Sequence, residues 1–195
     1  TSKEEDYRAR RITDYLNLVN VIVSEQIQKL RTAVFETGSE ITKYFEMLPG
    51  NSPLRLAFEK MLRSTCDEEK QTLEEYLRSQ ITPGRIDVNI MTKVDKNNYD
   101  KNGQLLADSS DALAALRGYA RSALTNSSIV FSAGLNLRLF NYVEKFDAFH
   151  ARGHGQFDKE IVIKVSDYRS ALVQGKYLAK KGLWVSEFRI ESGLN

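Results

Sequence analysis

The segment 160–195 constrains the fold more than any other part of the chain. A run of β-branched residues over 161–165 is followed by a helical pattern over 168–181 and then by a second strand-like run over 183–190. Two strands that are joined by a helix lie parallel in one sheet, because such crossovers are almost always right-handed. The strands are short and carry apolar residues on both faces, which is typical of a sheet that helices cover. The segment therefore predicts a parallel α/β fold.

The same order of strand and helix recurs upstream. Strands are expected over 86–92 and 128–133, with a helix over 111–124 between them and another helix after Gly134. Four parallel strands with their helices amount to half of a (β/α)₈ barrel. Nothing follows the fourth strand to cover it, so we expect an incomplete fragment of a larger scaffold, or a fold that a partner segment completes.

The region 1–82 has helical patterns and no strand signal. Apolar residues recur there at three- and four-residue spacing, which predicts helices over 7–36, 40–48, 54–63 and 67–80. The pair Pro83-Gly84 marks the turn at which the β-branched runs begin. We predict an α/β protein with a helical region over 1–82 and a βα-repeat region over 83–195. The latter is expected to be a partial, barrel-like parallel sheet of about four βα units.

Composition argues against several classes of protein. The 195 residues carry a formal net charge of +2, so we expect neither nucleic acid nor a membrane surface as partner. No apolar run approaches the roughly 20 residues that a spanning helix needs. Cys66 is the single cysteine and cannot form an internal disulfide, which favours a reducing, cytoplasmic location. His150 and His154 have no third ligand nearby in the sequence, so no metal site is expected.

In parallel α/β folds, ligands bind at the carboxyl ends of the strands. This rule selects polar and small residues at the expected strand ends and in the turns after them: Asn89, Lys93, Ser132, Gly134, Asn136, Lys164, Ser166, Arg189, Glu191, Ser192 and Gly193. The loop over 93–109 is longer than most βα connections, and we expect it to act as a lid or recruiting loop.

Lys164 is the most informative of these candidates, because it interrupts the apolar run Ile161–Val165. An unpaired buried charge costs several kcal/mol. The lysine therefore either faces a polar cavity, where it contacts a phosphate, a flavin or a substrate oxyanion, or pairs with Glu187 or Glu191 on the next strand. Both interpretations stay open. In the turn that follows Glu191, backbone N–H groups could approach an anion, although an ordinary turn explains the same residues.

Three segments resemble flavin-dependent barrels of the nitronate monooxygenase (2-nitropropane dioxygenase-like) type. IDVNIM over 86–91 looks like that family's strand ending in Val-Asn-Leu. SIVFSAGL over 128–135 is similar to the family's strand with the pattern VVSFxFG. The unit over 161–193 resembles its strand, capped helix with a terminal glycine, and strand that runs into Glu-Ala-Gly-Gly-His. The resemblance covers about residues 85–195.

This resemblance implies an FMN-binding barrel. Asn89 matches the family's flavin-contacting asparagine, and Glu191, Ser192 and Gly193 match its Glu-Ala-Gly. With the residues that topology selects, the expected cofactor-binding set is Asn89, Lys164, Ser166, Glu191, Ser192 and Gly193. Leu194 and Asn195 stand where the family has Gly-His, so its catalytic histidine has no counterpart here and we assign no catalytic residue.

Three functions follow as hypotheses. The first is an FMN-dependent oxidoreductase that acts on a small organic substrate under the loop 93–109. The second is a non-redox barrel enzyme that binds a phosphorylated metabolite through Lys164 and the turn 191–193. The third is a non-catalytic helical interaction module, in which the helix over 7–36 packs on a partner. The protein is also expected to form a homo-oligomer or to bind a completing segment.

Overall fold

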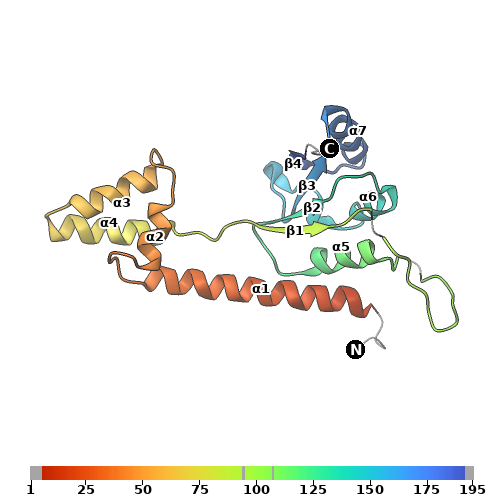
Figure 1. Cartoon of the computed structure of the whole chain (residues 1–195), viewed down its shortest axis with the longest axis horizontal. Coiled ribbons are helices and arrows are strands. Elements are labelled where there is room, and N and C mark those ends of the chain that lie inside the picture. Colours follow the sequence, from red (N-terminus) through yellow and green to blue (C-terminus); the bar gives the residue numbers. More distant parts are fainter. Residues whose placement is uncertain (1–5, 94, 107, 192–195) are drawn as a thin grey trace. The chain divides into compact units, whose positions relative to one another are not determined.

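The computed structural model describes residues 6–93, 95–106 and 108–191 (Figure 1). The predicted residues Ser192 and Gly193 lie outside this part of the chain. None of the helices in the described ranges combines the length and the hydropathy that a membrane span requires. Helices and strands follow in the order α1 (Tyr7–Thr32), α2 (Glu40–Glu46), α3 (Pro53–Arg63), α4 (Asp67–Gln80), β1 (Ile86–Ile90), α5 (Asp111–Arg121), β2 (Ser127–Phe131), α6 (Leu137–Val143), β3 (Glu160–Val165), α7 (Tyr168–Ala179) and β4 (Val185–Ile190).

The four strands form one parallel sheet in the order β1-β2-β3-β4, so each strand pairs with the next one in the chain. This confirms the predicted fold class: an α/β chain with an all-parallel sheet that follows an N-terminal helical region. The register between β3 and β4 shifts at Ile161/Val162, so that Val162 lies beside Glu187.

One face of the sheet carries the apolar core. Its strand residues include Ile90, Phe131 and Ile163, and they pack in a single buried cluster with residues of α5, α6, α7 and the first half of α1. The alternation of side chains along a strand directs the intervening residues to the opposite face. Helices α5, α6 and α7 are the crossovers between successive strands, and they therefore cover the apolar face.

The opposite face carries an ion-pair network that joins the two edge strands. Arg189 on β4 pairs with Asp87 on β1 at 2.7 Å, and Arg85 pairs with Glu187 on β4 at 2.7 Å and with Glu160 on β3 at 2.8 Å. Neighbouring strands lie roughly 4.8 Å apart, so edge strands of a flat four-stranded sheet would be about 14 Å apart. These side chains meet because the sheet curves toward its polar face, as a barrel wall does.

The chain divides into two compact units, which are described separately. One comprises the residues up to Asn20 and those from Arg85 onward, and the other is Val21–Gly84. The second unit has its own core, in which the rings of Phe45 and Phe58 stack with centroids 5.6 Å apart.

Arg78 fixes the end of α1 within this helical unit. Its guanidinium donates to the carbonyl oxygens of Arg31 at 2.7 Å and Ala33 at 2.6 Å, and it lies 4.9 Å from the centre of the Phe35 ring. The side chain therefore satisfies carbonyl groups that have no partner inside α1. Arg31 in turn donates to the carbonyl of Ile81 at 2.6 Å, which ties the start of the linker to the same helix end.

At the amino end of the sheet, Lys159 is a buried cation that satisfies the carbonyls after α5. It is 4 % exposed, its Nζ donates to the carbonyls of Ser122 at 3.0 Å and Leu124 at 2.9 Å, and it lies 4.6 Å from the centre of the Tyr119 ring. Burial lowers the pKa of Lys159 from 10.5 to about 8.

We expect the stability of the chain to rise by about 1–2 kcal/mol between pH 7 and pH 9.5 because of Lys159. The folded state releases its proton near pH 8 whereas the unfolded chain keeps it to about pH 10.4, so the unfolded state binds more protons in this window. Urea unfolding at several pH values measures this rise. A Lys159→Met chain should lack it, and parallel pH profiles for the two chains would contradict the assignment.

Candidate functional site

The carboxyl edge of the sheet is held together by side chains at the ends of β1 and β2. Thr92 donates its N–H to Ser132 Oγ at 2.8 Å and its hydroxyl to the carbonyl of Ser132 at 2.9 Å. Asn136 donates to the carbonyl of Thr92 at 3.1 Å, and its side-chain oxygen caps α6 by accepting the N–H of Leu139. These bonds fix the backbone just before Lys93 and on both sides of Gly134. Lys93 and Gly134 are two of the residues that the sequence placed at this edge.

Asp95 anchors the start of the long loop to the same edge. Its carboxylate accepts the N–H of Ala112 at 3.0 Å and pairs with Arg138 at 3.1 Å. Burial alone would raise the pKa of Asp95, but hydrogen bonds from Ser110 and Ala112 and the charge of Arg138 hold that pKa below its ordinary value. The carboxylate is therefore ionised at neutral pH and positions the loop rather than titrating there.

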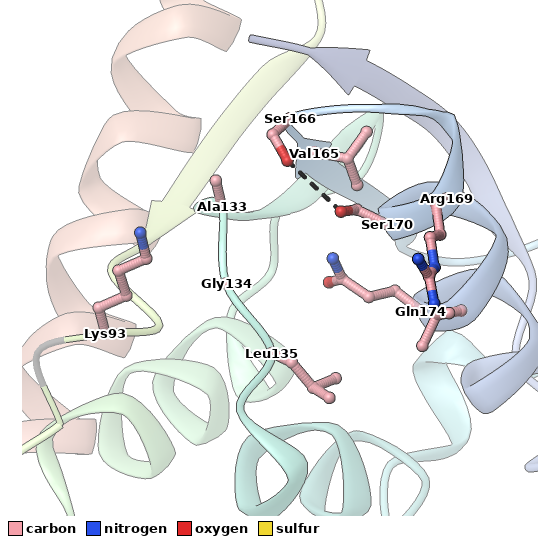
Figure 2. A pocket seen from close by; sticks show the side chains of 10 residues that line it. Lys93, Ala133, Gly134, Leu135, Val165, Ser166, Arg169, Ser170 and Gln174 are labelled. Atoms are coloured by element: carbon pink, nitrogen blue, oxygen red, sulfur yellow. Dashed lines mark hydrogen bonds between the residues drawn. The ribbon is translucent and has the colours of Figure 1, made fainter. Parts of the chain in front are cut away.

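A cavity of about 410 Å³ opens at this edge, on the side of the sheet that α7 covers (Figure 2). Its size lies within the range of ligand pockets, roughly 300–1,000 Å³. The ends of β1, β2 and β3 and the first turns of α7 line it, through Lys93, Ala133, Gly134, Leu135, Val165, Ser166, Arg169, Ser170, Val173 and Gln174.

Two cationic side chains at this cavity have no partner among the described residues. No hydrogen bond or ion pair joins the side chain of Lys93 or Arg169 to any residue in the described ranges. Gly134 has a φ of +131°, and a Cβ at this position would lie 2.9 Å from Lys93 Cε. The glycine thus leaves room for the lysine stem, so that Lys93 lies against the β2 turn.

The opposite wall of the cavity presents hydrogen-bond acceptors. The hydroxyls of Ser166 and Ser170 donate to Asp167 Oδ2 at 2.7 and 3.1 Å, so their protons are engaged and their oxygens remain to accept. Gln174 is only 5 % exposed, and its Oε1 is buried and accepts no hydrogen bond within the described part of the chain. Figure 2 shows its amide pointing into the space between Leu135 and the α7 backbone.

Asp167 is the N-cap of α7, and it uses the amide groups of that helix end. Its Oδ1 accepts the N–H of Ser170 at 2.8 Å. This backbone hydrogen bond, with those from the Ser166 and Ser170 hydroxyls, lowers the pKa of Asp167 below its ordinary value. An anion in the cavity would therefore be held by the side chains of Lys93 and Arg169 rather than by the helix end.

The predicted site residues do not all meet. Ser166 lines the cavity, whereas Asn89 and Lys164 belong to the alternate positions of β1 and β3 that face away from the apolar core. Lys164 pairs with Glu191 at 2.8 Å, which is one of the two arrangements that its sequence context allowed. Its side chain remains 25 % exposed, so the ammonium is also accessible to a ligand on the polar face.

Sequence reasoning missed Arg169, Ser170 and Gln174. The search for polar residues stopped at the turn after β3, but the cavity extends along the first two turns of α7. The spacing of Ser170 and Gln174, four residues apart, places both on one helix face and was a usable signal. Only the three-dimensional structure shows that Arg169 is exposed and that Gln174 Oε1 accepts no hydrogen bond within the described residues.

The long loop after β1 contains a small hairpin. Tyr99 and Leu105 form an antiparallel bridge, and Asp100 Oδ1 accepts the N–H groups of Asn102 and Gln104, each at 2.8 Å. Gly103 supplies the positive φ, +78°, that this turn requires. No group of three or more His, Cys, Asp or Glu side chains suited to a metal occurs in residues 6–93, 95–106 and 108–191.

The chain matches no known family model, no curated protein and no solved structure. The cavity and the polar face of the sheet lie in one unit of the chain.

Proposed function

We propose that this chain is part of an FMN-dependent oxidoreductase that binds its cofactor at the carboxyl edge of the parallel sheet and acts on a small organic substrate. The cavity of about 410 Å³ at the ends of β1, β2 and β3 carries this proposal. Ligands of parallel α/β enzymes bind at this edge. The resemblance of residues 85–195 to flavin-dependent barrels supports FMN as the ligand.

The residues present fit a flavin nucleotide. Asn89 is exposed on the polar face. The ammonium of Lys164 belongs to the same face and forms an ion pair with Glu191 alone among the described residues. An amide that donates and accepts, and a cation on the same face of the sheet, suit the polar edge of a flavin ring. We propose that Asn89, Lys164, Ser166 and Glu191 hold the cofactor, with Ser192 and Gly193 after them.

A bound flavin would supply the electron transfer, and the chain would bind, orient and shield it. The role proposed for Lys164 is to stabilise negative charge on the ring or on a substrate oxygen, because a fixed cation in a partly buried position acts more strongly than one in water. Asp95 anchors the start of the loop after β1 at the carboxyl edge, and the role proposed for this loop is to limit the access of water to the bound ligand.

The second candidate is a non-redox enzyme that binds a phosphorylated metabolite. The side chains of Lys93 and Arg169, which stand at the cavity without a partner in the described residues, favour this alternative. Both candidates place a phosphate-bearing ligand at the same edge of the sheet, and they differ in whether the rest of that ligand is a flavin.

A partner segment or a second copy of the chain is also part of the proposal. Between α7 and β4 lies an apolar groove of about 460 Å³, lined by residues that include Leu172, Phe188 and Ile190. Phe188 is 42 % and Ile190 is 68 % exposed. Covering these side chains would bury apolar area. A cytoplasmic location, which the single cysteine favours, is likewise proposed.

Titration of the chain with FMN tests the proposal, with quenching of flavin fluorescence as the readout. We expect saturable binding, and we expect Lys164→Met to weaken it by about tenfold or more, because a charge-assisted hydrogen bond contributes roughly 1.5–3 kcal/mol. Lys145→Met is the matched control, because Lys145 is an exposed residue just after α6 that pairs with Asp108. If the unaltered chain shows no saturable FMN binding, the proposal fails.

A further inference from the structure

We infer that the cavity beside α7 is a subsite for a phosphorylated polyol, with the phosphate between Lys93 and Arg169 and the hydroxyls on Ser166, Ser170 and Gln174. The inference rests on the proposed function in one respect: it takes the carboxyl edge to be a ligand site. It goes further by assigning the ligand chemistry to a set of five residues, four of which were not among the expected cofactor-binding residues.

Gln174 carries a buried acceptor oxygen that has no hydrogen bond within the described residues. A buried acceptor without a hydrogen bond destabilises the folded chain, so native proteins rarely leave one in place unless a ligand or water satisfies it. Gln174 is 5 % exposed, its Oε1 is buried and accepts no hydrogen bond from the part of the chain that the structure describes, and the residue lines a cavity large enough for a ligand. The group that satisfies this oxygen must donate a hydrogen bond.

The hydroxyl oxygens of Ser166 and Ser170 can also accept hydrogen bonds from a ligand. Asp167 accepts the protons of both hydroxyls, so Ser166 Oγ and Ser170 Oγ, which lie 3.4 Å apart, remain available as acceptors toward the cavity. One wall of the cavity thus presents three acceptor oxygens along the first two turns of α7. A ligand with several hydroxyl groups supplies matching donors at several points along this wall, whereas inorganic phosphate carries its few P–OH donors on one small ion.

Two charged side chains also border the cavity. Lys93 extends from the end of β1 and Arg169 from the first turn of α7, and neither side chain is neutralised by a described residue. Asp167 lies between Ser166 and Arg169 in the chain, and its hydrogen bonds with Ser166 and Ser170 hold it on the helix cap. Lysine and arginine side chains that lack a carboxylate partner are suited to a phosphate.

Two sources of this chemistry have to be separated. The ribityl phosphate of FMN carries both hydroxyls and a phosphate, and so does a free sugar phosphate. Calorimetric titration of the full chain with FMN, riboflavin, ribose 5-phosphate and inorganic phosphate distinguishes them. We expect ribose 5-phosphate to bind at least tenfold more tightly than inorganic phosphate, and FMN at least tenfold more tightly than riboflavin.

Variants then test the named residues. Arg169→Gln and Gln174→Met should each weaken the binding of FMN and of ribose 5-phosphate by about tenfold or more, while Lys176→Met, on the same helix but lining the apolar groove, should leave it unchanged. Gln174→Met should also raise the midpoint of thermal unfolding of the ligand-free chain, because it removes a buried acceptor that has no partner. A residue with a merely structural role would lower that midpoint.

The outcomes separate this inference from the proposed function. Binding of ribose 5-phosphate without FMN, with loss in the two variants, supports the subsite and refutes the flavoprotein. Binding of FMN that neither variant changes, with no binding of ribose 5-phosphate, overturns the subsite and leaves the flavoprotein standing. Equal affinity for inorganic phosphate and ribose 5-phosphate overturns the polyol assignment. Absence of binding for all four compounds refutes both. Arg169 is exposed, so its variant keeps the test valid if Gln174→Met does not fold.

Discussion

An Arg117→Ala chain is expected to lose about 3 kcal/mol of its free energy of unfolding. Arg117 is 8 % exposed, and its guanidinium forms a bidentate pair with Asp6 and donates to the carbonyl of Asp108 and to the hydroxyl of Tyr142, each at 2.8 Å. The hydrogen bonds to Asp6 and Tyr142 raise the pKa of Arg117, so the cation is present at every accessible pH. Its removal leaves the carbonyl of Asp108 and the hydroxyl of Tyr142 without this donor, and it leaves Asp6 with the exposed Arg121 as its ion-pair partner.

Arg121→Ala is the matched control. Arg121 also pairs with Asp6, at 3.1 Å, but its side chain is 57 % exposed, so we expect a loss below about 1 kcal/mol. Urea unfolding of the three chains at pH 7 measures both effects. Hydrogen bonding to Arg117 lowers the pKa of Asp6, and the associated stability is therefore present above about pH 4 and lost as the pH falls further. Equal losses for the two variants would contradict this account.

Gly118→Ala is expected to destabilise the chain by about 2 kcal/mol, although alanine is the better helix former. A Cβ at position 118 would lie 2.8 Å from the carbonyl oxygen of Ala9 and 2.8 Å from Ile12 Cβ, so it would collide with α1 where the two helices cross. Thr13 Oγ1 also donates to the carbonyl of Gly118 at 3.0 Å, which fixes this close approach. Overpacking of this kind costs roughly 1–3 kcal/mol.

Gly175→Ala provides the contrast, because it places the same change in the middle of α7. There the added Cβ would lie 3.0 Å from Phe188 Cζ, the far end of a side chain that is 42 % exposed and can move aside. We expect Gly175→Ala to be neutral or to stabilise by up to about 0.5–1 kcal/mol through helix propensity. Thermal and urea unfolding of both variants test this, and a stabilising Gly118→Ala would show that α1 and α5 do not pack as described.

Local sequence signals were sufficient to predict the order of elements. The apolar run at 161–165 became β3, and the helical patterns over 111–124 and 168–181 became α5 and α7, which Ser110 and Asp167 cap. Boundaries were less accurate. The first helix ends at Thr32 although its apolar pattern continued to 36, because Ala33 and Phe35 leave the helix to pack in the core of the helical unit.

The site was less accessible to such reasoning, because it depends on side chains from elements far apart in the sequence. Topology correctly placed Lys93, Gly134 and Ser166 together at one edge. It could not show that Arg169 would be left without an ion pair, or that Gln174 would be buried without a donor, since both follow from how α7 packs on β3. The link between Arg189 and Asp87 depends on the curvature of the sheet, which no local pattern encodes.

Amide hydrogen exchange with and without ligand tests the central claim, that the carboxyl edge of the sheet is the ligand site. With FMN, and separately with ribose 5-phosphate, we predict slower exchange in three segments, 92–93, 133–136 and 165–170, which border the cavity. Exchange around Thr125 and Asp158, in the hollow at the amino edge, should not change. Protection confined to the amino edge, or no protection anywhere at saturating ligand, would contradict the account.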